Sequence, residues 1–368
     1  MVLHDLGLLH DILALGARID RLYGADARSG RPVLDVRYAA LKGGRFGLAV
    51  HRAALFGVLF RAVQAAGIAV ETGTQIAGLD AGGETATLLD GKGGRLGGFD
   101  LVVDASGAHS ILRRHASTPS EPKPLGYGAF WASLQWPGAP FDPGSLIQRY
   151  ERASVMIGVL PIGRAEPGGG EMAAFFWSLK PDDAQAVRDG GLEAWKERVL
   201  SFWPDCEALT SQITDFGQLS LARYGHHTLV RPIGRRLAVI GDAAHSTSPQ
   251  LGQGANMALL DARALAHALE TTPDVETALP AYATARRRHV QTFQALSRMF
   301  TPFYQSDSLV LPFLRDHLVP TIARIPPAPQ FLAAMVAGTL VDPFAGIGLK
   351  EADWSLPAPP IASQGNRI

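Results

Sequence analysis

The segment from Leu237 to Asn256 constrains the fold more than any other part of the sequence. It begins with an apolar run, residues 237–240, of the kind that forms a buried strand, and this run ends at Gly241. Asp242 follows directly, so its carboxylate is expected at the carboxyl end of the strand, where open α/β sheets bind their ligands. Because a carboxylate only accepts hydrogen bonds, it suits the hydroxyl groups of a polyol and repels a phosphate. The segment therefore predicts an α/β fold with a ligand at this strand end.

Two glycines, Gly252 and Gly254, separate the strand end from a helix predicted over residues 256–269. Glycine leaves no side chain between the backbone and a ligand, and the free N–H groups at the helix start would face that ligand. A flat ring that becomes anionic on reduction is a chemically apt partner. The helix dipole contributes only about 0.3–1 kcal/mol, so it would tune such a ring rather than create its binding. The alternative is an ordinary strand–turn–helix unit that binds nothing.

The same residues carry a resemblance to a known family. Gly241-Asp-Ala-Ala-His245, Pro249 and Gly252-Gln-Gly-Ala-Asn256 resemble the second flavin motif of the class A FAD-dependent monooxygenases, the p-hydroxybenzoate hydroxylase-like aromatic hydroxylases. The resemblance implies that Asp242 binds the ribityl chain of FAD and that the backbone of residues 252–256 holds the pyrimidine edge of the flavin ring. It also implies that Pro249 lines the reacting face as a catalytic residue and that His245 is structural.

Two further segments match the family. Residues 101–113 resemble a strand and turn that usually reads Gly-Ala-Asp-Gly, but Asp104 and Ser106 replace the first glycine and the aspartate, so a role in NAD(P)H use stays open. Arg52, at a predicted helix start, matches an arginine that reaches the phosphate and ribityl region of the flavin; a surface arginine is the alternative. The predicted cofactor-binding residues are Arg52, Ser106, Gly107, Gly241, Asp242, Pro249, Gly252, Gln253, Gly254, Ala255 and Asn256.

One feature of the family is not found in the sequence. Its members begin with a strand and a Gly-x-Gly-x-x-Gly turn that holds the pyrophosphate of FAD, and no such motif occurs in this chain. The opening helix, predicted at 6–15, resembles one that normally lies further inside such proteins. We therefore expect that the first βαβ strand is missing, that the chain is truncated at its amino end, and that it binds FAD weakly.

The order of the predicted elements indicates an α/β fold in three parts. A parallel-sheet FAD-binding domain is expected over 1–116 and 225–278, an inserted antiparallel β-sheet substrate domain over 117–224, and a C-terminal helical region over 279–368, ending in a mobile Pro-rich tail. Strands are predicted at 33–50, 68–70, 101–103, 129–136, 146–150, 154–160, 173–179 and 236–240, with a glycine-rich hairpin at 73–98. Helices are predicted at 6–15, 52–66, 191–202 and 256–269.

Composition and charge argue against several classes of protein. With 34 acidic and 34 basic residues, the chain lacks the basic excess of a nucleic-acid-binding protein, and the run from Arg286 to His289 is expected on a solvated helix face. The single cysteine, Cys206, fits a reducing, cytoplasmic compartment, and no Cys/His cluster has metal-ligand spacing. The apolar stretch 331–341 is too short to span a membrane and predicts a buried helix, with a peripheral membrane or homodimer contact as the alternative.

The resemblance implies an enzyme that hydroxylates a small, aromatic substrate with NAD(P)H and O₂ through a flavin C4a-hydroperoxide. A flavin reductase or oxidase on the same fold and a catalytically inactive fragment are the alternatives. The inserted sheet is expected to floor the substrate pocket, with Trp131, Gln148, Tyr150 and Trp177 as its residues. Phe176 is a further candidate, but adjacent strand residues face opposite sides, so Phe176 and Trp177 cannot both line the pocket. Core packing is the alternative for each aromatic residue.

Overall fold

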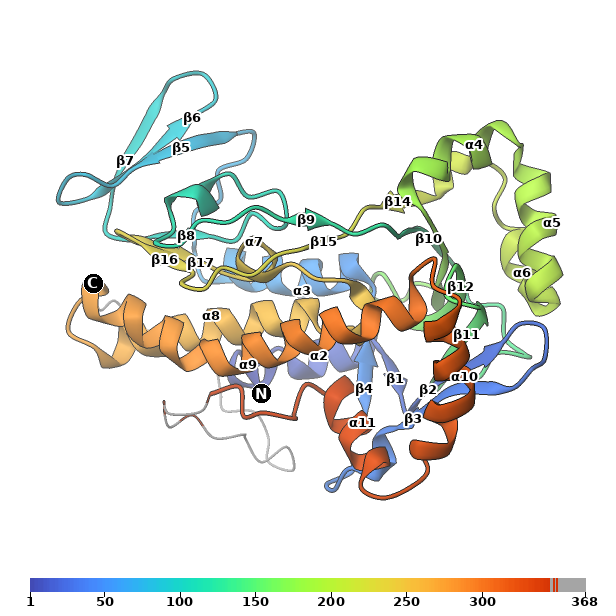
Figure 1. The fold of residues 1–368 in the computed structure, drawn as a ribbon. Helices are drawn as coiled ribbons and strands as arrows, with labels where there is room; N and C mark the ends of the chain where they lie inside the picture. The colour runs from blue at the N-terminus through green and yellow to red at the C-terminus, as the bar shows by residue number, and fades with distance from the viewer. Residues whose placement is uncertain (345–346, 348, 350–368) are drawn as a thin grey trace.

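A seven-stranded, mostly antiparallel sheet is the largest element of the computed structural model, which describes residues 1–344, 347 and 349 (Figure 1). In spatial order its strands are β14 (Ser220–Ala222), β10 (Gly128–Gln135), β13 (Met172–Leu179), β12 (Val155–Gly163), β11 (Ser145–Glu151), β2 (Arg21–Asp26) and β3 (Pro32–Arg37). The strands β10 to β13 confirm the four antiparallel strands predicted for the inserted domain.

Two strands of this sheet come from a part of the chain that we predicted to belong to the FAD-binding domain. β2 pairs parallel with β11 and antiparallel with β3. Gly24 permits this pairing because the ring of Tyr150 on β11 occupies the space that a side chain at position 24 would need. The predicted domain range 1–116 is therefore wrong for residues 21–37, which extend the substrate-side sheet.

The two faces of the seven-stranded sheet bury different residues of β13. Trp177 packs against Trp195 of α5 (Leu192–Phe202), with their ring centroids 5.9 Å apart. Phe176 points to the opposite face and lies 4.6 Å from the ring of Trp131. Burying a large apolar side chain contributes roughly 1.5–3 kcal/mol, so both faces stabilise the sheet. The helical layer over the Trp177 face also contains α4 (Ala184–Asp189) and α6 (Glu207–Thr210).

A smaller sheet has the parallel pairing expected of an α/β fold. The buried strand β17 (Leu237–Val239) pairs parallel with β8 (Val102–Asp104) and antiparallel with β16 (Ile233–Gly234), which confirms the strands predicted at 101–103 and 236–240. The strand predicted at 68–70 is wrong. Ile68 and Val70 are 59% and 49% exposed, and they pair with no strand in the described part of the chain, so their apolar side chains do not suffice to form one.

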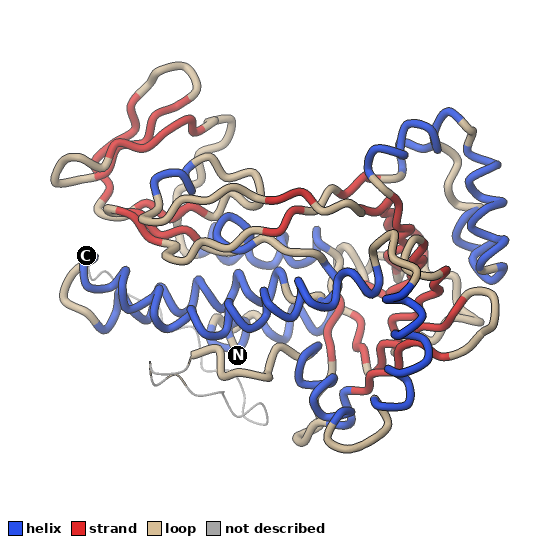
Figure 2. Tube along the Cα trace, viewed as in Figure 1, coloured by secondary structure: helices blue, strands red, loops and turns tan. Residues whose placement is uncertain are grey.

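Helices lie along the small sheet and form the C-terminal part of the described chain. The long helices α8 (Gly254–Thr271) and α9 (Val275–Tyr304) pack antiparallel beside the β16–β17–β8 sheet (Figure 2). The remaining α-helices are α1 (Val2–Asp5), α2 (Leu9–Leu15), α3 (Arg52–Ala65), α7 (Asp242–His245), α10 (Val310–Ile322) and α11 (Ala328–Val336). The helical prediction is thus confirmed up to Val336, whereas the Pro-rich tail lies outside the described residues. Within the described residues, every helix is too short or too polar to cross a membrane.

Shorter strand pairings complete the fold. The hairpin predicted at 73–98 is a three-stranded antiparallel sheet of β5 (Ile76–Asp80), β6 (Ala86–Asp90) and β7 (Arg95–Phe99), which projects from the small sheet (Figure 1). Two further pairs are β1 (Ala17–Ile19) with β4 (Gly47–Ala49) and β9 (Lys123–Pro124) with β15 (Gly225–His226). The pair β9–β15 lies between the β16–β17–β8 sheet and the seven-stranded sheet (Figure 1).

The close packing of Phe176 makes Gly158 on β12 a sensitive position. A Cβ atom at Gly158 would overlap the ring of Phe176, so Gly158→Ala should lower the free energy of unfolding by about 1–3 kcal/mol. The matched control is Gly126→Ala, because a Cβ there meets nothing within 4 Å. Urea denaturation of the two variants measures the difference; equal stabilities would contradict this packing.

Candidate functional site

The loop of residues 249–256 joins the carboxyl end of the small sheet to α8. A 3₁₀ turn over Pro249–Leu251 leads into Gly252, whose φ of +63° is left-handed and favours glycine. The first N–H groups of α8 have no intrahelical acceptor, and no side chain of the described chain caps them. The positive end of this helix is therefore available to a ligand.

Asp242 lies beside this helix start. Gly241, with a φ of +59°, turns the chain so that Asp242 opens α7 with an exposed side chain. An ideal Cβ on Gly254 would lie 3.9 Å from Oδ1 of Asp242. The acceptor-only carboxylate and the uncapped helix start therefore border the same space, as the sequence predicts.

A cleft of about 1540 Å³ lies between the 249–256 loop and the seven-stranded sheet. The loop contributes Pro249, Gln250, Leu251, Gly252, Gln253 and Asn256 to its lining. Of the predicted substrate-pocket residues, Trp131, Gln148 and Tyr150 line it, together with Phe176. Lining residues that the sequence analysis missed include Tyr23, Tyr38, Met156, Tyr224, Tyr304, Gln305 and Arg315.

The predicted pocket role of Trp177 is wrong. Trp177 is 2% exposed and belongs to the apolar cluster between the sheet and α5, on the face away from the cleft. The alternation of β13 places Phe176 on the cleft face in its stead. The expectation that only one of the two neighbours lines the pocket is thus confirmed.

The aromatic wall of the cleft contains two polar pairs. The indole Nε1–H of Trp131 donates to the hydroxyl of Tyr224 at 2.7 Å, and the hydroxyl of Tyr150 donates to Oε1 of Gln148 at 2.9 Å. Burial raises the pKa of Tyr224 to about 12, so this phenol stays protonated at neutral pH. Because its oxygen already accepts from Trp131, its proton is the group left to meet a ligand.

A buried cation, Arg315 of α10, supports the end of this wall. Its guanidinium packs over the rings of Tyr150 and Tyr304, at 4.9 Å and 5.2 Å from their centroids. It donates to Asp316 and to the carbonyl oxygens of Phe303 and Arg152. These bonds direct Arg315 into the protein, and its role in the cleft is to hold the two phenol rings.

Seven of the predicted cofactor-binding residues do not line the cleft: Arg52, Ser106, Gly107, Gly241, Asp242, Gly254 and Ala255. Arg52 is exposed at the first turn of α3. Ser106 follows β8, and its hydroxyl donates to Oδ1 of Asp104 at 2.5 Å. Because Asp104 pairs with Val239 in the parallel ladder, Ser106 and Asp242 both follow the carboxyl ends of their strands, on the same side of the small sheet.

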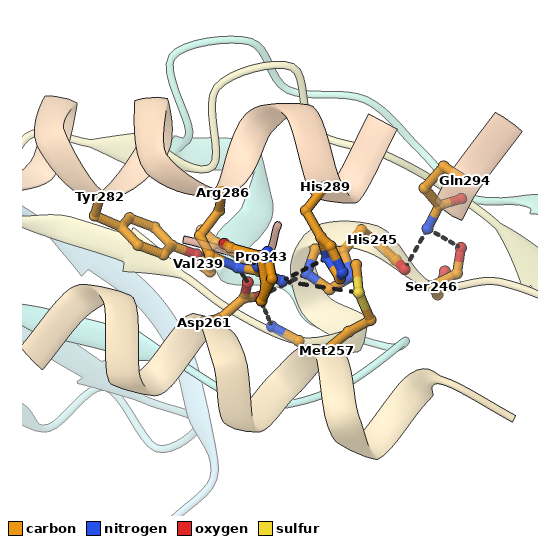
Figure 3. A network of polar contacts seen from close by, with 11 residues as sticks. Val239, His245, Ser246, Met257, Asp261, Tyr282, Arg286, His289, Gln294 and Pro343 are labelled. Atoms are coloured by element: carbon orange, nitrogen blue, oxygen red, sulfur yellow. Dashed lines mark hydrogen bonds and ion pairs between the residues drawn. The ribbon is translucent and has the colours of Figure 1, made fainter. Parts of the chain in front are cut away.

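A buried network centred on Asp261 of α8 holds the turn behind the loop (Figure 3). The fully buried carboxylate accepts from the backbone N–H of Gly241 at 2.9 Å, from Nε2 of His245 at 2.6 Å and from Nε of Arg286 at 2.8 Å. Burial acts to raise the pKa of Asp261, but His245 and Arg286 outweigh it and lower that pKa. The carboxylate therefore stays charged and fixes both ends of α7, which confirms a structural role for His245.

The prediction that the basic run at 286–289 forms a solvated helix face is wrong. The run is divided between core and solvent. Arg287 and Arg288 are exposed, whereas Arg286 and His289 are 1% and 0% exposed. Helical periodicity turns these two residues toward Asp261, where the ion pair compensates the burial of Arg286. Sequence reasoning missed this site because the partner carboxylate lies on a different helix.

These features fit the ring and ribityl end of FAD. Asp242 can accept hydrogen bonds from ribityl hydroxyls, and the uncapped N–H groups of α8 can donate to the carbonyl oxygens of the flavin ring. Gly252 leaves room for the ring, since a Cβ there would meet nothing within 4 Å. Among the described residues, the small sheet has a single parallel pair, β8–β17.

A glycine loop at a parallel strand end, facing an antiparallel sheet across a cleft, is the architecture of an α/β flavoprotein. The chain belongs to the FAD binding domain family, which matches residues 1–297, and FAD is the cofactor of that family. It is 28% identical over 329 residues to the 3-amino-4-hydroxybenzoate 2-monooxygenase of Streptomyces cremeus, covering 83% of this chain and 76% of the relative.

Other similarities agree with this family. A kynurenine 3-monooxygenase of Salinispora tropica is 30% identical over 239 residues, which is 62% of this chain; the match spans about half of that relative, 49% of its length. The fold is also that of Klebsiella pneumoniae HpxO, solved with FAD and uric acid. That structure aligns with a TM-score of 0.74 and 20% identity over 92% of this chain and 85% of its own.

The buried His289 should make stability depend on pH. Burial, reinforced by the charge of Arg286, lowers its pKa to about 4, whereas an unfolded histidine titrates near 6.5. Below the unfolded pKa the unfolded chain binds more protons, so the free energy of unfolding should fall by about 2 kcal/mol between pH 6.5 and 5, and fall further toward pH 4. Urea denaturation across this range measures the slope.

The variant His289→Gln distinguishes the contribution of His289 to the pH dependence of stability from that of other histidines. This control is needed because burial also lowers the pKa values of His226 and His227. The variant should lose the His289 part of the pH dependence. An unchanged slope would show that His289 takes up its proton equally in both states.

Proposed function

We propose that this protein is an FAD-dependent monooxygenase that hydroxylates a small aromatic substrate with NAD(P)H and O₂. The observation that carries the proposal is the single cleft that brings the 249–256 loop, fitted to the flavin ring, opposite the aromatic wall of Trp131, Tyr150 and Phe176. When bound, FAD supplies electron transfer from NAD(P)H and the activation of O₂. The substrate classes named for the relatives, an aminohydroxybenzoate and kynurenine, support an aromatic substrate.

The residues of the loop would hold the cofactor and set its orientation. The N–H groups at the start of α8 would donate to the ring, and the carboxylate of Asp242 would accept from the ribityl hydroxyls. Pro249 lines the cleft. By the family motif it would lie at the reacting face of the ring, where it would restrict the space for substrate and keep water off that face. These roles follow the family motif and the placement of the loop.

The opposite wall would orient the substrate. Phe176 and Trp131 offer apolar ring surfaces for an aromatic molecule, and the proton of the Tyr224 hydroxyl can be donated to a substrate oxygen. Because the pKa of Tyr224 is raised to about 12, it acts as a hydrogen-bond donor rather than as a base at neutral pH. Gln148, oriented by Tyr150, is the neighbouring polar group.

We also propose a cytoplasmic compartment. The support is Cys206, which is fully buried and free, and whose thiol pKa is raised by burial. A buried, protonated thiol of this kind is inert and requires no oxidising environment.

Labelled oxygen tests the proposed reaction. With FAD, NADH or NADPH and a panel of phenols and aminobenzoates, NAD(P)H oxidation should rise with the correct substrate, and one atom of ¹⁸O₂ should appear in the product. Oxidation without incorporated label would identify the chain as a flavin reductase or oxidase. If the chain neither binds flavin nor oxidises NAD(P)H, it is a catalytically inactive protein.

The substitution Tyr224→Phe tests the orienting role of the phenol. Removing one hydrogen bond to the substrate should raise KM about fivefold to tenfold with a smaller effect on kcat. Tyr127→Phe is the matched control, since its hydroxyl bonds Asp307 at 2.8 Å and does not line the cleft. Equal KM values for the two variants would remove Tyr224 from the substrate site.

A further inference from the structure

The end of α11 presents backbone carbonyl groups that have no partner within the helix to the flavin side of the molecule. The helix closes at Gly338 with a Schellman motif, in which the N–H of Gly338 donates to Met335 at 3.2 Å and the N–H of Thr339 donates to Ala334 at 2.9 Å. Gly338 has a φ of +74°, which this motif requires. The carbonyl groups of Val336 and Gly338 are left to accept from other elements.

Three side chains from the flavin side use the carbonyl groups of this segment. Nε2 of Gln253, in the 249–256 loop, donates to the carbonyl of Val336 at 2.7 Å. Two residues of α9 extend the contact: His289 donates to Gly338 at 3.1 Å and Arg286 donates to Pro343 at 2.8 Å. Residues 336–343, which we name the C-terminal clasp, are thus tied to the loop and to the Asp261 network.

The contact with the clasp fixes Gln253, whose glycine neighbours would otherwise leave it free to move. Gln253 stands between Gly252 and Gly254, and glycine has the largest conformational freedom of any residue. Its amide is held at both atoms, because Oε1 accepts from Nδ2 of Asn256 at 2.8 Å while Nε2 donates to the clasp. The side chain of Gln253 is therefore directed toward the clasp, and the backbone N–H groups at the start of α8 are left for a ligand.

The packing at Gly338 admits no side chain. A Cβ there would overlap Oε1 of Gln253 and would lie 2.9 Å from Nδ2 of Asn256. Any larger residue at position 338 would displace the amide pair that anchors the loop. The loop and the clasp are therefore in close contact at Gly338.

We propose that the C-terminal clasp is a positioning element of the flavin site, which holds the 249–256 loop in its ligand-binding shape through Gln253 before any ligand arrives. The proposal rests on the assignment of the flavin ring to this loop. Ordering a backbone residue costs about 1–2 kcal/mol, and a loop ordered in advance does not incur that cost on binding. The clasp would act on the site through the loop, although Val336 and Ala337 also line the cleft.

Hydrogen exchange in the ligand-free protein tests the clasp independently of flavin binding. Gly338→Ala should release the loop, so the bonded amides of Gly252 and Met257 should exchange about tenfold faster. The matched control is Gly168→Ala, whose φ of +79° imposes the same backbone strain but where a Cβ meets nothing within 4 Å. Equal protection of the loop in both variants would overturn the proposal, whether or not the chain binds FAD.

Flavin binding then shows whether the clasp matters for the cofactor. In FAD titrations followed by flavin fluorescence, Gly338→Ala and Gln253→Leu should each weaken binding about fivefold to tenfold, and Gly168→Ala should not. The double variant should bind no more weakly than either single one, because both remove the same contact. Additive losses would overturn coupling through Gln253. If Gly338→Ala does not fold, exchange and binding by Gln253→Leu decide the matter, since unchanged values would again overturn it.

Discussion

The buried carboxylate of Asp261 is the interaction on which the cofactor side of this protein depends. Its buried hydrogen bonds join the turn at Gly241, the end of α7 and the long helix α9. Removing one partner of a buried ion pair typically costs about 3–5 kcal/mol, because the other charge is left uncompensated. The shape of the turn at Gly241 is therefore determined by the buried groups behind it.

The two walls of the cleft are held by different kinds of force. The sheet wall depends on apolar packing, with Trp177 and Trp195 on one face supporting Phe176 on the other. The loop wall depends on the hydrogen bond that Gln253 donates to the C-terminal clasp, and on the Asp261 network that holds the preceding turn at Gly241. A change in the aromatic core would therefore alter the stability of the sheet, whereas a change in the polar contacts would alter the shape of the loop.

The sequence predicts the loop and most of the inserted sheet because these features are local. Glycine spacing and the apolar run before Gly241 identify a strand–turn–helix unit, and alternation identifies β10 to β13. Alternation also shows that Phe176 and Trp177 face opposite sides. It does not show which side is the cleft, because that depends on where α5 packs.

The features that the sequence does not predict all depend on partners far away in the chain. Strand β2 joins the seven-stranded sheet through its parallel pairing with β11, more than a hundred residues later. Arg286 and His289 belong to a run of four basic residues, and such runs are usually solvated; only Asp261 on α8 makes their burial possible. Likewise, nothing local in the sequence connects Gly338 with Gln253.

The pairing of rings with glycines in the seven-stranded sheet has an evolutionary consequence. Tyr150 lies over Gly24 and Phe176 lies over Gly158, so each ring and its glycine form a unit of fixed total volume. A homologue that shortens the side chain at 176 gains room for a larger residue at 158, and the same holds for 150 and 24. Diversification of substrate choice on this fold should therefore proceed by paired exchanges across neighbouring strands rather than by single replacements.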